Sequence, residues 1–250
     1  MNVTEADHRD AARIATDAGR LLLDLRRRLD DPSTDPAQLR ADGDRTANEL
    51  ILAALAETHP GDAILSEESK DDPVRLDAER VWIVDPLDGT REFGEAGRSD
   101  WAVHVALVVG GAAAAGAVAL PALGVTLDTG DPPTLPPPSG QLRIIGSRSR
   151  LSDHVRRLVD ELGGELVLMG SAGAKAMAVV RGEAEVYAHT GGQYEWDSAA
   201  PVAVAAAAGL HVSRIDGSPL VYNQADPYLP DLLICRRELA DRVIAASTGD

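Results

Sequence analysis

The 250-residue sequence predicts an α/β (α+β) fold in which helices and sheets are stacked in layers. Helix-like and strand-like segments alternate along most of the chain without a long interruption. Several short apolar segments, rich in β-branched residues, run directly into acidic residues, as buried strands do where they end at a polar edge. The hydrophobic content of 44% is enough to bury a substantial core, as one large domain or two lobes.

The first quarter of the chain predicts two helices. Apolar residues at helical spacing indicate a helix over residues 4–30, which Thr4 can cap. Residues 31–43 are expected to form a loop, because they are rich in Pro, Asp, Ser and Gly. A second helix is expected from residue 44 to about residue 59, and Asp42 or Asp44 can simply be its N-cap.

Strands dominate the next part of the chain. Short strands are expected at 63–65, 81–85 and 125–127. Residues 101–123 contain no Asp, Glu, Lys or Arg and have the length of a membrane span. The pair Gly110-Gly111 interrupts them, which favours a β-hairpin over residues 101–120 and not a transmembrane helix.

The Pro-rich segment 131–140 can form neither a helix nor a central strand, so it is the expected connection between two lobes. The N-terminal lobe would comprise residues 1–130 and the C-terminal lobe residues 141–250. Strands in the second half are expected at 142–145, 166–168, 185–188, 211–214 and 231–235. Helices are expected at 152–162, from the small-residue loop 170–175 through residue 180, at 198–208, and from about residue 237.

The composition excludes some partners. A formal net charge of -16 argues against binding to nucleic acids or anionic membranes. The negative electrostatic field of this net charge would repel an anionic substrate. Divalent cations and a few Arg or Lys side chains would have to reverse the field at the binding site. A single cysteine, Cys235, excludes an intrachain disulfide and fits a reducing, cytoplasmic location. The first ten residues are charged and acidic, unlike a signal peptide.

The segment from Val81 to Thr90 carries the strongest chemical signal. An apolar strand stops at Asp85, Pro86 prevents further ladder pairing, and Asp88-Gly89 indicates a turn. Two carboxylates held this close raise each other's pKa unless a cation lies between them, and hard oxygen ligands suit Mg²⁺. The alternative for an isolated pair of this kind is an acidic surface turn after a core strand.

Two further acids lie at comparable positions. Glu67 follows the strand 63–65, and Asp197 opens a helix. If these acids meet Asp85 and Asp88, they provide oxygen ligands for two or three Mg²⁺ ions. Two such metals can bind the attacking and leaving oxygens of an in-line displacement at phosphorus.

A water-activating pair is also available. Asp44 and the hydroxyl of Thr90 can orient a water molecule and take its proton, as a general base does. The backbone N–H groups of Gly89 and Thr90 follow the acidic turn and can bind phosphate oxygens. The chain therefore contains the groups that metal-dependent phosphate hydrolysis requires.

Three motifs together resemble the signature of the inositol monophosphatase superfamily: Ser66-Glu67-Glu68-Ser69, Asp85-Pro86-Leu87-Asp88-Gly89-Thr90 and Trp196-Asp197-Ser198-Ala199-Ala200. The resemblance spans nearly the whole chain and implies a layered αβαβα sandwich. It also implies a Mg²⁺-dependent, lithium-sensitive phosphomonoesterase and a homodimer. The metal ligands that it implies are Glu67, Asp85, the Leu87 carbonyl, Asp88 and Asp197, and the catalytic groups are Glu67 and the pair Asp44 and Thr90.

The branch of the family is suggested by other segments. Ser147-Arg148-Ser149 and the loop 170–175 look most like the 3'-phosphoadenosine 5'-phosphate phosphatases, which release AMP and phosphate in sulfate assimilation. The resemblance makes the sulfated form of the nucleotide a further expected substrate. Lys175, with Gly170 and Ser171, suits a substrate phosphate. Ser147 and Arg148 can serve the second phosphate or the nucleoside. The alternative for Lys175 is a solvated helix lysine.

The residues just before Asp197 bear on the substrate. His189, Thr190 and Tyr194 can line a leaving-group pocket, whereas Trp196 is expected to pack in the core. Inositol monophosphatases usually place an acid seven positions before this aspartate, where Thr190 stands, which argues against inositol phosphate. Inositol phosphate or fructose 1,6-bisphosphate remains the alternative substrate. A non-catalytic binding protein is a further alternative, but it would not need Asp44 and Thr90.

Overall fold

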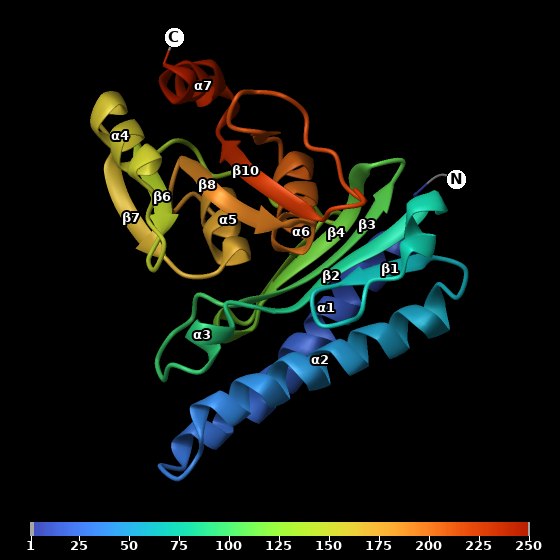
Figure 1. Cartoon of the computed structure of the whole chain (residues 1–250). Helices are drawn as coiled ribbons and strands as arrows, with labels where there is room; N and C mark the ends of the chain where they lie inside the picture. The colour runs from blue at the N-terminus through green and yellow to red at the C-terminus, as the bar shows by residue number, and fades with distance from the viewer. Residues whose placement is uncertain (1–2, 250) are drawn as a thin grey trace.

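The computed structural model describes residues 3–249 as five layers in the order α, β, α, β, α (Figure 1). Two five-stranded sheets are separated by one pair of helices and covered on their outer faces by two further pairs. The expectation of an αβαβα sandwich is therefore confirmed.

The first sheet has the strand order β1-β2-β3-β4-β5. β1 and β2 are parallel, and every other neighbouring pair is antiparallel. Because parallel strands end at the same sheet edge, the acids that follow β1 and β2 are brought together. β3 and β4 form the expected hairpin around Gly110 and Gly111, both with positive φ. The strands are β1 (Ala63–Ser66), β2 (Arg80–Asp88), β3 (Ala102–Val109), β4 (Ala112–Leu120) and β5 (Val125–Asp128).

Helices α1 (Glu5–Arg26) and α2 (Pro36–Thr58) cover the outer face of this sheet. The prediction of a loop over residues 31–43 was wrong for its second half, since α2 begins at Pro36. Its N-cap is Asp35, whose side chain accepts from the Ala37 N–H, so neither Asp42 nor Asp44 caps the helix. Proline is favourable in the first turn of a helix, where its missing N–H would have no partner.

The second sheet has the order β7-β6-β8-β10-β9. Its central strand β8 is longer than the predicted 185–188, because it continues through two glycines to Tyr194. α5 and α6 lie between the sheets, and α4 and α7 cover the outer face. The strands are β6 (Arg143–Ser147), β7 (Glu165–Met169), β8 (Val186–Tyr194), β9 (His211–Ser213) and β10 (Tyr228–Cys235). The helices are α4 (Asp153–Leu162), α5 (Ala172–Val180), α6 (Glu195–Ala207) and α7 (Ala240–Thr248).

Short helical segments complete the chain. α3 (Thr90–Phe93) follows β2 at the acidic turn. The 3₁₀ segments are Arg27–Asp30, Pro73–Asp77, Pro121–Leu123 and Arg237–Leu239.

The two sheets lie on either side of the Pro-rich segment in the sequence, since β5 ends at Asp128 and β6 begins at Arg143. One apolar cluster nevertheless joins both sheets through α5 and α6, whose buried side chains include Met177, Val179 and Val204. The division into two lobes stays a prediction.

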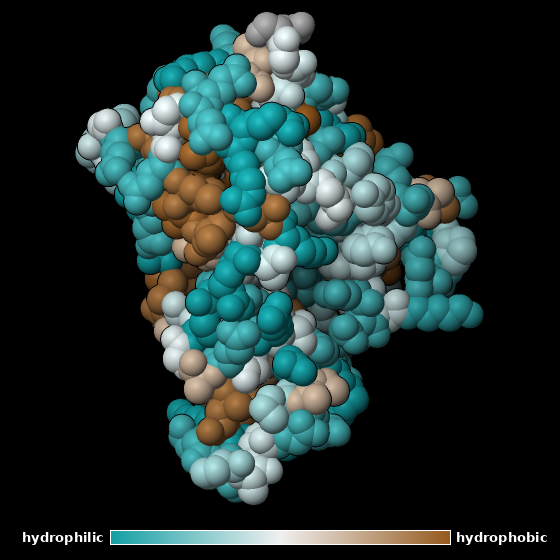
Figure 2. All heavy atoms as spheres, turned by 60° about the vertical axis from the view of Figure 1, so that its left-hand side comes forward, coloured by the Kyte–Doolittle hydropathy of each residue, from teal (hydrophilic) through white to brown (hydrophobic). Residues whose placement is uncertain are grey.

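The surface is mainly hydrophilic on the side shown in Figure 2, with separate hydrophobic areas between the polar side chains. Within residues 3–249, no helix has both the length and the apolar character that crossing a bilayer requires. The uncharged stretch 101–123 instead forms β3, β4 and the turn between them.

Candidate active site

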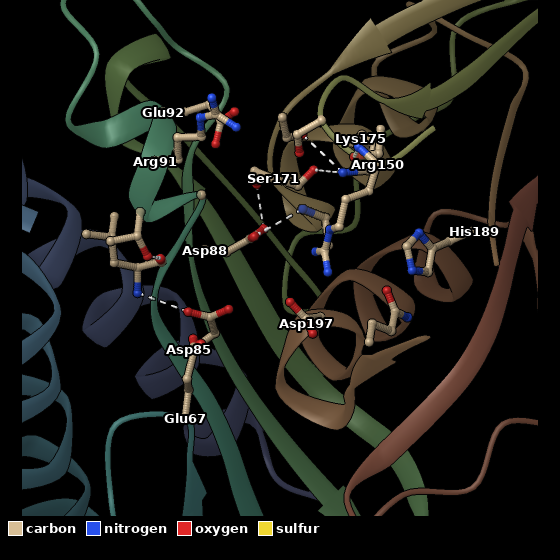
Figure 3. A pocket seen from close by; sticks show the side chains of 18 of the residues that line it. Glu67, Asp85, Asp88, Arg91, Glu92, Arg150, Ser171, Lys175, His189 and Asp197 are labelled. Carbon is tan, nitrogen blue, oxygen red and sulfur yellow. Dashed lines mark hydrogen bonds between the residues drawn. The ribbon is translucent and has the colours of Figure 1, made fainter. Parts of the chain in front are cut away.

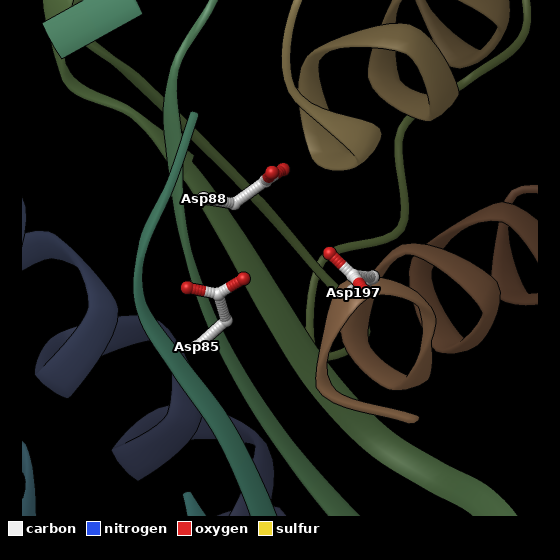
Figure 4. A group of neighbouring side chains, drawn as sticks. All are labelled: Asp85, Asp88 and Asp197. Atoms are coloured by element: carbon white, nitrogen blue, oxygen red, sulfur yellow. The ribbon is translucent and has the colours of Figure 1, made fainter. Parts of the chain in front are cut away.

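Three carboxylates converge where the first sheet faces the central helices (Figure 4). One oxygen from each of Asp85, Asp88 and Asp197 lies within 4.8 Å of the others. Asp85 and Asp88 are buried on β2, whereas Asp197 is half-buried near the start of α6. Glu67 lies beside Asp85 (Figure 3), where burial and the neighbouring carboxylates act on its carboxyl. The structure thus brings together the four acids that the sequence predicted.

Local backbone structure positions each acid. The pairing of β2 with β3 is irregular between Asp85 and Asp88, which breaks the alternation of faces and lets both residues serve one site. Asp85 Oδ1 accepts the Leu87 N–H at 3.0 Å, which fixes the turn. Asp197 accepts the Tyr194 N–H at 2.7 Å and so caps α6.

The electrostatics of the cluster are unfavourable without a cation. Burial of the carboxyl and the charges of Asp197 and Asp88 raise the pKa of Glu67 to about 7. Burial and the neighbouring carboxylates also raise the pKa of Asp85 well above its usual range. Four carboxylates in this position fit a hard divalent cation, which would allow all of them to ionise.

Asp88 differs from its neighbours because the chain itself stabilises its charge. Its carboxylate accepts the Ser171 hydroxyl, and the N–H groups of Ala172 and Gly173 at 3.1 and 2.6 Å. His104 Nε2 lies 3.2 Å from Asp88 Oδ2. Burial opposes ionisation, but these contacts with His104 and Ser171 lower the pKa of Asp88 overall. The carboxylate of Asp88 thus occupies the N-terminus of α5.

Asp44 and Thr90, for which a water-activating role is predicted, lie near each other. Thr90 Oγ1 lies 3.4 Å from Asp44 Oδ1, a long contact, and donates to the Leu87 carbonyl at 3.0 Å. Asp44 lies within α2, directly after the buried Gly43, which packs against Leu87 and Phe93. Burial and the charge of Glu68 raise the pKa of Asp44 to about 7.

Lys175 is buried, with 5% of its surface exposed, so the alternative of a solvated helix lysine is wrong. Its Nζ donates to the carbonyls of Gly170 at 3.2 Å and Ser171 at 2.5 Å. The Gly170 N–H donates to Asp100. The polar groups of this loop are therefore largely engaged within the protein, while Lys175 still lines the site cavity.

The loop after β6 contributes a cation that sequence reasoning missed. Arg148, the predicted residue, bonds Glu92 and Glu95 and is not among the side chains that line the cavity. Arg150 lines it instead and extends into it (Figure 3). Among residues 3–249, no carboxylate lies within ion-pair distance of its guanidinium. Nothing in the alternating Ser-Arg-Ser-Arg sequence distinguishes the two arginines.

The cavity has a volume of about 240 Å³. Its lining includes the predicted Ser147, Gly170 and Ser171 and, from β8, His189. The other two predicted pocket residues point elsewhere: the Thr190 hydroxyl bonds Ser152, and Tyr194 is exposed and stacks on Trp196. Trp196 is partly buried and packs against the core, as expected. Tyr187 and Gln193, which sequence reasoning did not single out, complete the β8 side.

Comparison with known proteins agrees with this fold. The model of the inositol monophosphatase family matches residues 3–130 and 140–248, so the chain belongs to that family. A 3'-phosphoadenosine 5'-phosphate phosphatase of Mycobacterium leprae is 52% identical over 92% of this chain and 89% of its own length. The 3'(2'),5'-bisphosphate nucleotidase CysQ of Escherichia coli is 32% identical over 74% of this chain and 80% of its own length.

Solved structures show the same architecture. The crystal structure of CysQ from Bacteroides thetaiotaomicron superposes with a TM-score of 0.78 and 28% identity, covering 93% of this chain and 98% of that one. An inositol monophosphatase from Staphylococcus aureus has a TM-score of 0.80 at 21% identity, covering 96% and 95%, and supports the fold alone.

Proposed function

We propose that this protein hydrolyses the 3'-phosphate of 3'-phosphoadenosine 5'-phosphate, and of its 5'-phosphosulfate form, to give the 5'-nucleotide and inorganic phosphate. The observation that carries the proposal is one cavity that holds the acids Asp85, Asp88 and Asp197 together with Arg150, whose guanidinium has no carboxylate partner among residues 3–249. The names of relatives that are 52% and 32% identical over most of the chain support this substrate.

The cofactor in this proposal is Mg²⁺, with two or three ions in each site. Glu67, Asp85, Asp88, Asp197 and the Leu87 carbonyl would hold them, because hard oxygen ligands match this ion. When bound, Mg²⁺ supplies the positive charge that neutralises the phosphate and lowers the pKa of the attacking water. The raised pKa values of Glu67 and Asp85 support a site designed for such a charge.

The chain's own groups handle the proton and orient the phosphate. Thr90 Oγ1 orients the water and relays its proton to Asp44, whose pKa of about 7 suits a base working near neutrality. The water oxygen bonds to phosphorus as the bond from phosphorus to O3' breaks, and O3' leaves with a proton from solvent. The N–H groups of Gly89 and Thr90, both in the cavity lining, hold the phosphate oxygens.

The second phosphate is assigned to the loop after β6. Arg150, with Ser147 beside it, is available to bind it, whereas Arg148 is held by Glu92 and Glu95. Lys175 adds a positive charge deeper in the cavity. In this proposal, Gly170 and Ser171 act by holding Lys175 and Asp88 in place.

Cellular context and assembly follow from the same proposal. The one cysteine, Cys235, is buried and free, which fits a reducing, cytoplasmic location. We expect a lithium-sensitive homodimer, as the family resemblance implies. Light scattering would test the dimer, and inhibition by LiCl against an equal concentration of NaCl would test the lithium sensitivity.

The substrate is tested by phosphate release with Mg²⁺ from 3'-phosphoadenosine 5'-phosphate, inositol 1-phosphate and fructose 1,6-bisphosphate. We expect kcat/KM to favour the nucleotide at least about a hundredfold, or ~2.7 kcal/mol of differential transition-state binding. Similar values for all three would reject the nucleotide assignment. Absence of release from every substrate would favour the non-catalytic alternative.

A further inference from the structure

One side of the cavity is uncharged and comes from a single strand. Tyr187, His189 and Gln193 all belong to β8, whose pairing with β10 is irregular between Thr190 and Gln193. All three line the cavity, and together they are called the β8 wall. The acids of β2 lie on the opposite side (Figure 3). The cavity therefore has one wall for cations and another that offers only neutral hydrogen-bonding groups.

Gln193 is the most informative residue of the β8 wall. Its side chain is 6% exposed, and neither its Oε1 nor its Nε2 has a hydrogen-bond partner among residues 3–249. A buried polar group without a partner costs about 1–3 kcal/mol. Folded proteins retain such groups rarely, and mostly where a ligand or function accounts for them. The carboxamide offers both an acceptor and donors to whatever enters the cavity.

Tyr187 repeats this pattern. The residue is only 1% exposed, and its hydroxyl has no hydrogen-bond partner among the described residues. Burial raises the pKa of Tyr187 well above its usual range, so the hydroxyl keeps its proton and can donate as well as accept.

His189 completes the wall as an acceptor. Its Nε2 lies 2.9 Å from the Gly192 carbonyl, which can only accept, so Nε2 carries the hydrogen. Burial lowers the pKa of His189, which keeps the ring neutral and leaves Nδ1 as an acceptor.

We propose that the β8 wall binds the ribose of the leaving nucleotide, and that the Gln193 carboxamide hydrogen-bonds the 2'-hydroxyl next to the scissile 3'-phosphate. This inference rests on the proposed function. A hydroxyl both donates and accepts, which matches the free groups of Gln193 and Tyr187. Tyr194, the residue after Gln193, donates its backbone N–H to the carboxylate of Asp197. The β8 wall therefore lies next to the acids that surround the phosphate.

The test compares wild type and Gln193→Met on three substrates: 3'-phosphoadenosine 5'-phosphate, its 2'-deoxy analogue and p-nitrophenyl phosphate. Methionine keeps the length of the side chain and removes the amide. We expect the variant to lose at least about tenfold in kcat/KM on the ribonucleotide, which corresponds to ~1.4 kcal/mol. Its kcat/KM on the deoxynucleotide and on p-nitrophenyl phosphate should change less than about twofold, because neither has the hydroxyl.

Two further variants complete the design. Thr190→Val is the matched control, because Thr190 lies on the same strand but bonds Ser152, and it should leave the ribo-to-deoxyribo ratio unchanged. If Gln193→Met does not fold, Gln193→Asn carries the same test, since it keeps an amide but withdraws it by one methylene group.

Equal losses of Gln193→Met on the ribo- and deoxyribonucleotide would overturn the inference and would point to the adenine edge, which glutamine can also bind. Wild type that hydrolyses p-nitrophenyl phosphate but neither nucleotide would overturn the proposed function, and this inference with it. The two failures are therefore distinguishable.

Discussion

The charged side chains at the two ends of β2 differ in whether a partner of opposite charge lies beside them. At its start, Arg80 is buried and bonds the carboxylates of Asp7 and Asp62. At its end, Asp85 and Asp88 lie among other acids. One strand therefore presents a compensated cluster of charges at one end. At the other end, burial and repulsion oppose the ionisation of Glu67 and Asp85, although His104 and Ser171 stabilise Asp88.

The first cluster is complete within the chain. Arg80 Nη2 lies 2.6 Å from Asp7 Oδ1, and Trp82 Nε1 donates to Asp62 Oδ2 at 2.9 Å. Burial alone would raise the pKa of Asp7, but hydrogen bonds from Arg80 and Thr4 lower it overall. Such a cluster joins α1, β2 and the turn before β1, and it needs no further partner.

The second cluster is complete only with a bound cation. The pKa values of Glu67 and Asp85 are raised, because burial and mutual repulsion oppose their ionisation. Perturbed carboxylates in a cavity are candidates for function, whereas satisfied buried ion pairs are more often structural. In the proposed function, the same residue types serve stability at one end of β2 and catalysis at the other.

The largest effect is expected from breaking the compensated cluster. Arg80→Met removes the guanidinium that bonds Asp7 and Asp62 and leaves the His59 imidazole beside them. The variant should lower the unfolding free energy by about 3–5 kcal/mol, as measured by urea denaturation. The exposed Arg13→Met on α1 is the matched control and should cost less than about 1 kcal/mol. If both variants lose the same small amount, the first cluster is not structural.

The complementary change removes one acid of the second cluster. Asp85→Asn should lower kcat at least about a hundredfold. Even mutation of residues that only hydrogen-bond a metal ligand typically lowers metal affinity or activity by about 10–100-fold. The unfolding free energy without Mg²⁺ should not fall at pH 7, because a repulsive charge is removed. Retention of full Mg²⁺-dependent turnover would contradict the assignment of Asp85.

The pH dependence of stability should differ in sign between the two ends. In metal-free protein, Glu67 binds its proton more tightly in the folded state than in the unfolded state. Its contribution to the unfolding free energy therefore falls as the pH rises from 4.5 to about 7. The advantage of Glu67→Gln over wild type in urea denaturation with EDTA should therefore grow across this window. Asp7 behaves in the opposite way, because its pKa is lowered in the folded state. It stabilises the fold above pH 3.8, and this stabilisation is lost as the pH falls through the lowered pKa. A Glu67→Gln advantage that shrinks toward neutrality would contradict this account.

The smallest effect concerns the cation that faces the acids. Arg150→Met should raise KM for 3'-phosphoadenosine 5'-phosphate about tenfold, because the variant loses the binding energy of a hydrogen bond between charged groups. It should hardly change KM for adenosine 3'-phosphate, which lacks the second phosphate. Arg148→Met is the matched control, because Arg148 bonds Glu92 and Glu95 and does not itself line the cavity. Equal effects of the two substitutions would remove Arg150 from the substrate site.

The sequence predicted the acids well because their positions follow from simple rules. Each of Glu67, Asp85 and Asp88 follows or ends an apolar strand, and parallel strands share an edge. The start of α2 was harder to predict, because Pro36 and Gly43 both resemble loop residues. Pro36 lies at the first helical position. Gly43 lies where a Cβ atom would be 3.0 Å from Leu87 and Phe93, so close packing requires glycine there.

The neutral side of the site could not be predicted from residue patterns. Gln193 follows two glycines and lies beyond the predicted strand 185–188, yet β8 continues through them and Gln193 lines the cavity. The choice between Arg148 and Arg150 depends on where Glu92 and Glu95 lie, and these acids are more than fifty residues away in sequence. Three-dimensional contacts, and not local pattern, decide both cases.

The central claim is that the acids at the end of β2 form a cation site, and thermal unfolding with and without Mg²⁺ tests it most directly. At a hundred times its dissociation constant, Mg²⁺ should stabilise the wild type by about 2.7 kcal/mol, which raises Tm by roughly 5–10 °C. Arg80→Met should start from a lower Tm and show the same increase, whereas Asp85→Asn should show little or none. An increase of equal size in Asp85→Asn, or none in the wild type, would contradict the claim.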